Sequence, residues 1–148
     1  WSVAENLEHL SLSMERSWFG LFLPKFLLKW KFGKPKHTSL TYEELVEVYY
    51  KKIDEGFETE KRFVPAIKQE KDAKEKLITR FEHVAKKYLD QVRYYWEDEN
   101  IDNYQIPHPV LGMITIRELL YFNLFHNTHH YKTMRSRKNE AQEFSVAE

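Results

Sequence analysis

The sequence predicts a single domain built almost entirely from α-helices. The chain has 148 residues, of which 42% are hydrophobic and 16% aromatic, and this is enough apolar material for the core of one ordinary domain. It contains only four glycines and five prolines. Tight turns are therefore few, which favours long helices over a many-stranded sheet. No stretch alternates with a period of two for long enough to predict a sheet.

Capping boxes predict where three helices begin. In a capping box, Ser or Thr and a Glu three residues later each accept a hydrogen bond from the other's free backbone N–H. Such pairs occur at Ser2 and Glu5, at Thr41 and Glu44, and at Thr115 and Glu118. Apolar residues at helical spacing follow each pair. The helices predicted from these boxes cover residues 2–19, 41–55 and 115–136.

A further helix over residues 70–97 is predicted by the longest apolar stripe in the chain. Asp72 and Glu75 form a looser capping pair near its start, since Asp also caps well. The stripe then runs for about seven turns without Gly or Pro. Its members are Leu77, Phe81, Val84, Tyr88, Val92, Tyr95 and Trp96.

The remaining segments are predicted to be two connectors and a tail. The connectors span residues 57–69 and 97–112, and both contain proline. The apolar stripe of the last helix stops after Met134. We therefore expect a helical domain over residues 1–136, followed by a flexible tail over 137–148.

Residues 18–32 form the most unusual segment. Ten of these fifteen residues are apolar, but Pro24 and three lysines interrupt them. The segment is too short and too charged to span a bilayer, so no membrane span is expected. It fits an interfacial amphipathic helix, a subunit contact or the wall of an apolar pocket. The simplest interpretation is that it packs on the bundle while its lysines extend to water.

Composition excludes several functions. With 23 basic and 23 acidic residues the formal net charge is zero, which argues against a nucleic-acid partner. No cysteine is present. Disulfides, thiolate metal sites and a cysteine nucleophile are therefore excluded, and a reducing, cytoplasmic location is expected. The sequence also lacks a G-x-S-x-G elbow, a Gly-rich phosphate loop and an H-E-x-x-H motif.

A pair of histidines in the last helix could bind a metal ion. His126 and His130 are four residues apart, so a helix places both on one face, with Cβ atoms about 5–6 Å apart. Two imidazoles at this separation can point at one ion. From spacing alone they could equally be a half-buried or surface pair. A metal site needs a third ligand, and His9 in the first helix is the best candidate, although its position also fits a boundary histidine.

The other histidines are expected to have other roles. His37 lies in a basic loop and His83 lies off the apolar stripe, so both are expected to be solvated. His129 points away from His130 on the helix and is expected to be exposed. His108 precedes the last helix, whose first residue Thr115 lies about 16 Å along the helix axis from His126. His108 is therefore expected to shape the turn before the helix and not to bind the metal.

These motifs, in this order, resemble the DinB/YfiT-like superfamily of small helical proteins. The resemblance rests on WSVAENLEHL at the start and HPVLGMITIRELLYFNLFHNTHH near the end. Three further pieces, LPKFLLKWKFGKP, TYEELVEVYYKKI and the FVP at 63–65, resemble one bacterial branch of it. The similar region runs from Trp1 to about Arg135. Members usually carry another helix before the W-S element, so we expect this chain to be a truncated piece of a longer protein.

The resemblance implies an up-and-down four-helix bundle that holds a divalent metal with three histidines. The histidine of the W-S-x-x-E-x-x-x-H element corresponds to His9, and those of the last-helix H-x-x-x-H correspond to His126 and His130. Zinc is the first expectation for the metal, with nickel, iron or manganese as alternatives, because imidazole suits several of these ions.

The resemblance implies two possible activities, and a non-catalytic role is the rival interpretation. A metal-dependent hydrolase would use water in the open coordination position. An S-transferase would bind a low-molecular-weight thiol there, with a small-molecule electrophile as the second substrate. A helical interaction or stress-response module would use neither a metal-bound water nor a thiol. A homodimer is plausible because aromatic helix faces could form an interface.

Two polar residues near the histidines are candidates for catalysis. Glu5 lies one turn before His9 and could orient it or act as a base, although a capping role with Ser2 is the simpler interpretation. Asn127 is adjacent to His126 and could bind substrate or water. Its simpler role is a buried hydrogen bond between helices.

Overall fold

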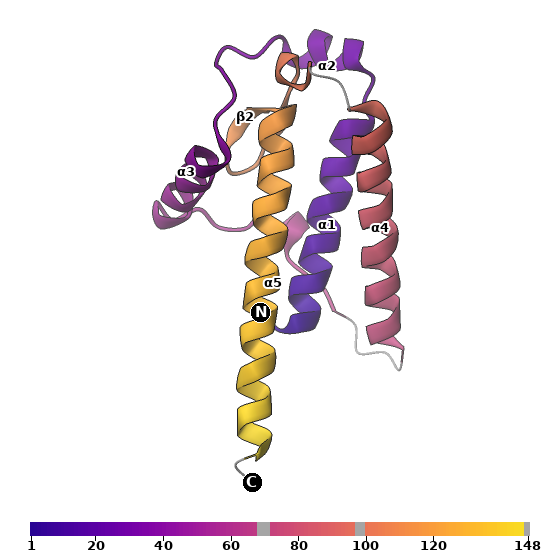
Figure 1. The fold of residues 1–148 in the computed structure, drawn as a ribbon, viewed down its shortest axis with the longest axis vertical. Helices are drawn as coiled ribbons and strands as arrows, with labels where there is room; N and C mark the ends of the chain where they lie inside the picture. Colours follow the sequence, from indigo (N-terminus) through magenta and orange to yellow (C-terminus); the bar gives the residue numbers. More distant parts are fainter. Residues whose placement is uncertain (68–71, 97–99, 147–148) are drawn as a thin grey trace.

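Three long helices form the body of the molecule in the computed structural model (Figure 1). They are α1 (Val3–Phe22), α4 (Ala73–Tyr95) and α5 (Ile116–Val146). The structure describes residues 1–67, 72–96 and 100–146, with side chains as far as residue 138. α1 lies between α4 and α5 and packs against both. The prediction of an all-α fold is confirmed.

Shorter elements connect these helices. α2 (Lys25–Phe32) follows α1 at the upper end of the bundle, and α3 (Tyr42–Asp54) packs against the outer side of α5 (Figure 1). Single 3₁₀ turns occur at η1 (Lys61–Phe63) and η2 (Ile101–Asn103). The connection through α3 returns the chain to the lower end, so α1 and α4 run in the same direction and α5 runs opposite to both.

A small hairpin precedes α5, where the sequence predicts only a connector. β1 (Gln105–His108) pairs antiparallel with β2 (Gly112–Thr115), with Gln105 opposite Thr115 and His108 opposite Gly112. Four residues per strand are too few for a recognisable alternation of polar and apolar positions, so periodicity could not predict it. Gly112 has φ +75°, a value that favours glycine, and it begins the second strand.

The three capping boxes are confirmed. The Glu5 carboxylate accepts from Ser2 N at 2.7 Å, and the Glu44 carboxylate accepts from Thr41 N at 2.8 Å. Asp72 is different, because its side chain makes no capping hydrogen bond to the described first turn of α4. The predicted residues 70–71 and 97 of this helix lie outside the described part of the chain.

α5 is longer than predicted. It continues to Val146, ten residues beyond the expected end at 136. The residues after Met134 are mostly good helix formers without Gly or Pro. The helix can therefore continue after its apolar stripe has ended, and the flexibility of residues 137–148 stays a prediction.

Residues 18–32 do pack on the bundle, but only with one side. Pro24 separates α1 from α2, and Leu21 and Leu28 on either side of it have no exposed surface. The Lys29 ammonium lies 4.7 Å from the centre of the Tyr104 ring. The aromatic side chains on the other side are exposed, namely Phe19, Phe22, Phe26 and Trp30. Among the described residues, no helix is both long and apolar enough to cross a bilayer.

The hairpin and the start of α5 are held against α1. A Cβ added at Gly20 would lie 3.1 Å from the Ile106 side chain, so α1 and β1 approach closely at this glycine. Ile116 at the start of α5 is completely buried. These contacts fix where α5 begins and hence how its histidines face α1.

Candidate metal centre

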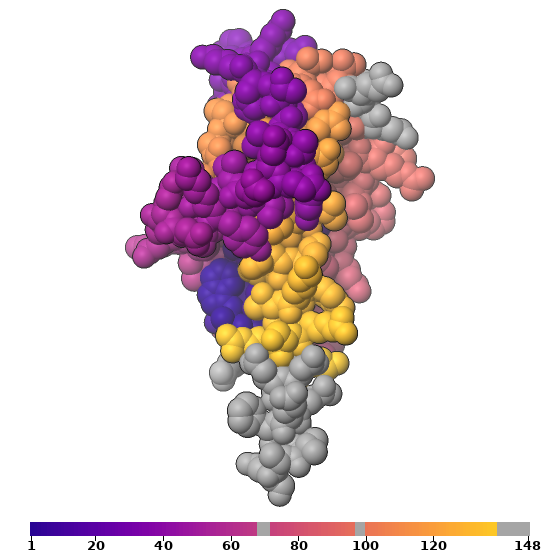
Figure 2. All heavy atoms as spheres, turned by 60° about the vertical axis from the view of Figure 1, so that its left-hand side comes forward, coloured from indigo at the N-terminus to yellow at the C-terminus, as the bar shows by residue number. Residues whose placement is uncertain are grey.

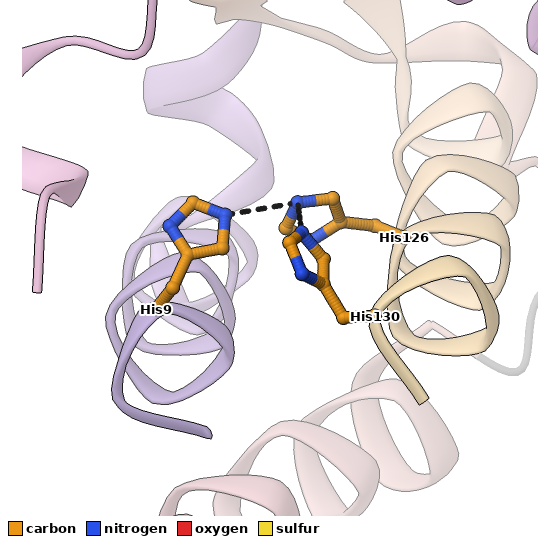
Figure 3. A group of neighbouring side chains, drawn as sticks. All are labelled: His9, His126 and His130. Carbon is orange, nitrogen blue, oxygen red and sulfur yellow. Dashed lines mark hydrogen bonds between the residues drawn. The ribbon is translucent and has the colours of Figure 1, made fainter. Parts of the chain in front are cut away.

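His9, His126 and His130 converge between α1 and α5 (Figure 3). The Nε2 atom of His126 lies 3.1 Å from Nε2 of His9 and 3.2 Å from Nε2 of His130. One nitrogen from each ring lies within 4.8 Å of the other two. The space-filling view shows the N-terminal residues in indigo beside α5 in yellow, so the start of the chain lies next to its last helix (Figure 2).

His9 is oriented by the backbone of η1. It is 6% exposed, and its Nδ1 lies 2.8 Å from the carbonyl oxygen of Phe63. A carbonyl only accepts hydrogen bonds, so Nδ1 carries the proton and donates it. Nε2 is then left with a lone pair that points at the other two rings.

His130 is oriented by a buried amide. The Asn6 amide nitrogen donates to the carbonyls of Trp1 and Ser2, at 3.2 and 2.8 Å. The amide oxygen therefore faces His130, whose Nδ1 donates to it at 2.6 Å. As in His9, the lone pair is left on Nε2. The Trp1 ring covers the cluster, with its centre 4.7 Å from the centre of the His9 ring.

His126 connects the other two rings and is 4% exposed. Its ring stacks on Phe122, with centroids 4.9 Å apart. Its Nδ1 has no hydrogen-bond partner among the described residues. A proton on Nε2 could be donated to His9 or to His130, but not to both, because both present lone pairs. One of the two close nitrogen contacts therefore lacks a proton.

Burial keeps all three imidazoles neutral. It lowers the pKa of His9, although the hydrogen bond to Phe63 opposes this shift. Burial also lowers the pKa of His130 to about 3, with smaller contributions from the charges of His9 and His129. The pKa of His126 is held well below its ordinary value by burial and then by the neighbouring histidines. Neutral imidazole is the form that binds metal ions.

The donor set fits a divalent cation. A cation among the three Nε2 atoms would accept all three lone pairs, so both close nitrogen contacts would be satisfied. The His126 proton would then be on Nδ1, which has no acceptor among the described residues. Four-coordinate zinc, with Zn–N of about 2.0–2.1 Å, places ligand nitrogens about 3.3–3.4 Å apart. The observed contacts of 3.1 and 3.2 Å are close to this value.

A cavity of about 110 Å³ adjoins the cluster on the side of His9 and His126. Its walls come from α1, α3, η1, the hairpin and α5. Half of its lining side chains are apolar, including Ile53, Phe57, Phe63, Ile106, Leu119 and Phe122. None of residues 18–32 lines it. The expectation that this segment forms the wall of a substrate pocket is therefore wrong for this cavity.

The two predicted catalytic candidates lie outside the cavity lining. Glu5 is half-buried and is engaged in its capping box, and the hydrogen bonds from Ser2 lower the pKa of its carboxyl. The Asn127 amide donates to Asn123 O at 2.7 Å, so its hydrogen bond lies within α5 and does not join two helices as expected. Catalytic roles for Glu5 and Asn127 stay predictions.

Among the remaining histidines, His37 is exposed as predicted but also has a partner, and His129 differs from expectation. His37 is 43% exposed, but its Nε2 lies 3.2 Å from the buried carboxylate of Glu118. His129 is half-buried, and its Nδ1 lies 3.4 Å from the hydroxyl of Tyr50. Tertiary contacts account for both: the 33–41 loop places His37 against Glu118 of α5, and α3 places Tyr50 against His129. His83 is exposed as predicted.

His108 shapes the turn of the hairpin, as predicted. Its Nδ1 accepts hydrogen bonds from the backbone N–H groups of Val110 and Leu111, at 3.3 and 3.2 Å. The same ring also lines the cavity beside the cluster, which the sequence does not indicate.

Replacing Asn6 with Leu is expected to weaken metal binding about 10- to 100-fold. The reason is that His130 would lose the acceptor that fixes its tautomer and ring orientation, and losing such a partner typically has this effect. Titration with zinc or nickel against a competing chelator measures the affinity. Ser11→Ala is the matched control, because Ser11 is also buried in α1 but bonds only within that helix. Equal affinities in both variants would contradict the role of Asn6.

Comparison with protein families supports the fold. A family model described as the DinB superfamily matches residues 1–134. All three clustered histidines lie within the matched range. Comparisons with curated proteins and with solved structures found no match.

Proposed function

The chain belongs to the DinB superfamily, and from this premise we propose that it is a metal-dependent hydrolase whose ion is bound by His9, His126 and His130. Family membership and the histidine cluster together fit a metal-binding protein. The observation that supports the proposal is the convergence of three neutral imidazoles whose Nε2 atoms face one another. Hydrolysis is the proposed step beyond metal binding.

Each residue of the site would have a defined part. His9 and His130 present lone pairs because Phe63 and Asn6 accept their Nδ1 protons. His126 joins them from one turn earlier on α5. A bound zinc ion would supply a water molecule whose pKa is about 7 in the remaining coordination position. The apolar cavity beside His9 and His126 would hold the substrate and limit access of bulk water.

Zinc is the first proposal for the metal. Three imidazoles without a carboxylate or thiolate are a common zinc donor set, although nickel, iron and manganese also bind imidazole. Elemental analysis of protein purified without chelator is expected to give close to one divalent ion per chain. Protein that is fully stable without metal and does not respond to added zinc or nickel would favour the non-catalytic helical module.

The hydrolase proposal is tested with a panel of small esters and amides. We expect turnover without any thiol, loss of turnover after treatment with a chelator, and recovery when the metal is restored. The same panel, extended to alkylating electrophiles, is assayed with and without a bacillithiol-like thiol. Turnover that strictly requires the added thiol would overturn the hydrolase in favour of the S-transferase.

A further inference from the structure

The charged groups that line the cavity leave one cation without an ion-pair partner among the described residues. Arg16 and Glu60 are its charged lining residues apart from histidine. The Glu60 carboxylate is paired with the Arg62 side chain at 2.8 Å. Arg16 is exposed, and it has no ion-pair partner in the part of the chain that the structure describes. An anion near the solvent-facing side of the cavity would therefore meet an unpaired guanidinium.

His108 adds a hydrogen-bond donor to the same cavity. Its Nδ1 accepts two backbone N–H groups of its own turn, so the ring proton must be on Nε2. The Nε2–H group has no acceptor within the described residues. The ring lines the cavity, and burial lowers the pKa of His108 to about 4. At neutral pH it is therefore an uncharged N–H donor, not a cation.

His108 and the histidine cluster border one space. The Phe122 ring contacts both, with its centre 4.2 Å from the centre of the His108 ring and 4.9 Å from that of His126. All three rings line the cavity. A molecule in the cavity can therefore reach the His108 donor and also lie next to His126.

The size of the cavity limits what can bind. An apolar cavity of roughly 150 Å³ holds one benzene molecule. At about 110 Å³ and lined by the exposed Arg16, this cavity suits a body of about one ring or a short branched chain, with a polar end near Arg16. The apolar walls favour such a body over a sugar or a nucleotide.

We propose that the cavity binds a small apolar carboxylate, with a carboxylate oxygen accepting a hydrogen bond from His108 Nε2–H and the charge attracted by Arg16. This assignment rests on the proposed function and names the substrate class of that site. The substrate would carry its hydrolysable bond at the end near His9 and His126. Its carboxylate would serve for recognition and take no part in the reaction.

Three probes that share a phenyl ring test this assignment on the protein as purified. Benzoate has the charge and the acceptor oxygens, benzamide keeps an acceptor without the charge, and toluene has neither. We expect affinities in the order benzoate, benzamide, toluene, measured by calorimetry or by ligand-observed NMR. Arg16→Gln should weaken benzoate about five- to tenfold and leave benzamide unchanged.

Two variants of His108 separate its role in the turn from its role in the cavity. His108→Asn keeps an acceptor near the position of Nδ1, but its side chain is too short to place its amide N–H donor at the position of Nε2. His108→Gln keeps a donor near the position of Nε2 but removes the turn acceptor. We expect His108→Asn to weaken benzamide about three- to tenfold, the contribution of one hydrogen bond, and His108→Gln to have little effect. A second measurement uses the unmodified protein and so does not depend on whether the variants fold. In it, benzamide should shift the ¹⁵N signal of His108 Nε2.

The outcomes distinguish this assignment from the proposed function. Metal content is measured in the same samples. Probes that bind equally to all variants, or an unshifted His108 Nε2 signal, would overturn the assignment even if metal binds at one ion per chain. Probe binding that depends on Arg16 and His108 in protein that takes up no metal would support the pocket and overturn the metal-dependent hydrolase.

Discussion

A variant in which His126 and His130 are both replaced by alanine is expected to lose the metal, from close to one divalent ion per chain to a small residual fraction. His9 alone would remain, and a single imidazole does not retain a divalent ion through purification. The two removed rings lie on one face of α5. The Nε2 atom of His126 lies 3.2 Å from Nε2 of His130 and 3.1 Å from Nε2 of His9, which belongs to α1. Elemental analysis and chelator competition measure the loss.

The stability of the protein gives a second measurement of the same effect. A ligand that binds only the folded state stabilises it by RT ln(1 + [L]/Kd), which is about 2.7 kcal/mol at one hundred times Kd. Zinc or nickel should therefore raise the melting temperature of the unmodified protein and leave that of the double variant unchanged. Because His126 is buried, the variant should also have a somewhat lower melting temperature without metal.

A double variant with two other histidines is the control. His83→Ala with His129→Ala removes the same number of imidazoles from α4 and α5, outside the cluster. It is expected to keep one ion per chain and the full response of the melting temperature. Equal metal contents in the two double variants would show that the ion is bound elsewhere, and the proposed site would be wrong.

The site could be predicted in part because its helices carry strong local signals. Ser2 with Glu5 and Thr115 with Glu118 define where α1 and α5 begin, and helical geometry then places His126 and His130 on one face. His9 could not be placed by spacing, since its partners are more than a hundred residues away. The family resemblance supplied that pairing, and the structure brings the three rings together.

The partners of the histidines and the cavity were beyond the reach of the sequence. His9 is oriented by the backbone carbonyl of Phe63, and a carbonyl is present at every residue, so no side-chain pattern indicates it. The Asn6 amide that fixes His130 looks like an ordinary helical residue. The sequence assigns His108 only to a turn, because the hairpin that aims it at the cavity is too short to show a period of two.

Replacing Glu118 with alanine is expected to destabilise the fold by about 3–5 kcal/mol, a large part of the 5–15 kcal/mol typical of a domain. Its carboxylate is 1% exposed and accepts from Thr115 N at 2.6 Å and Leu40 N at 2.9 Å. His37 Nε2 lies 3.2 Å from it. Alanine would leave buried N–H groups without an acceptor, and each such group costs about 1–3 kcal/mol. Urea unfolding measures the change.

The same substitution at Glu44 is a matched control, because Glu44 has the same position in the capping box of α3 but is exposed. Water can replace its carboxylate, so Glu44→Ala should cost about 1 kcal/mol or less. Glu118 lies two helical turns before His126 and does not contact the cluster. Folded Glu118→Ala protein should therefore still bind one ion per chain. The buried carboxylate would then be a structural anchor that joins the 33–41 loop to α5. Equal losses of stability at Glu118 and Glu44 would refute that role.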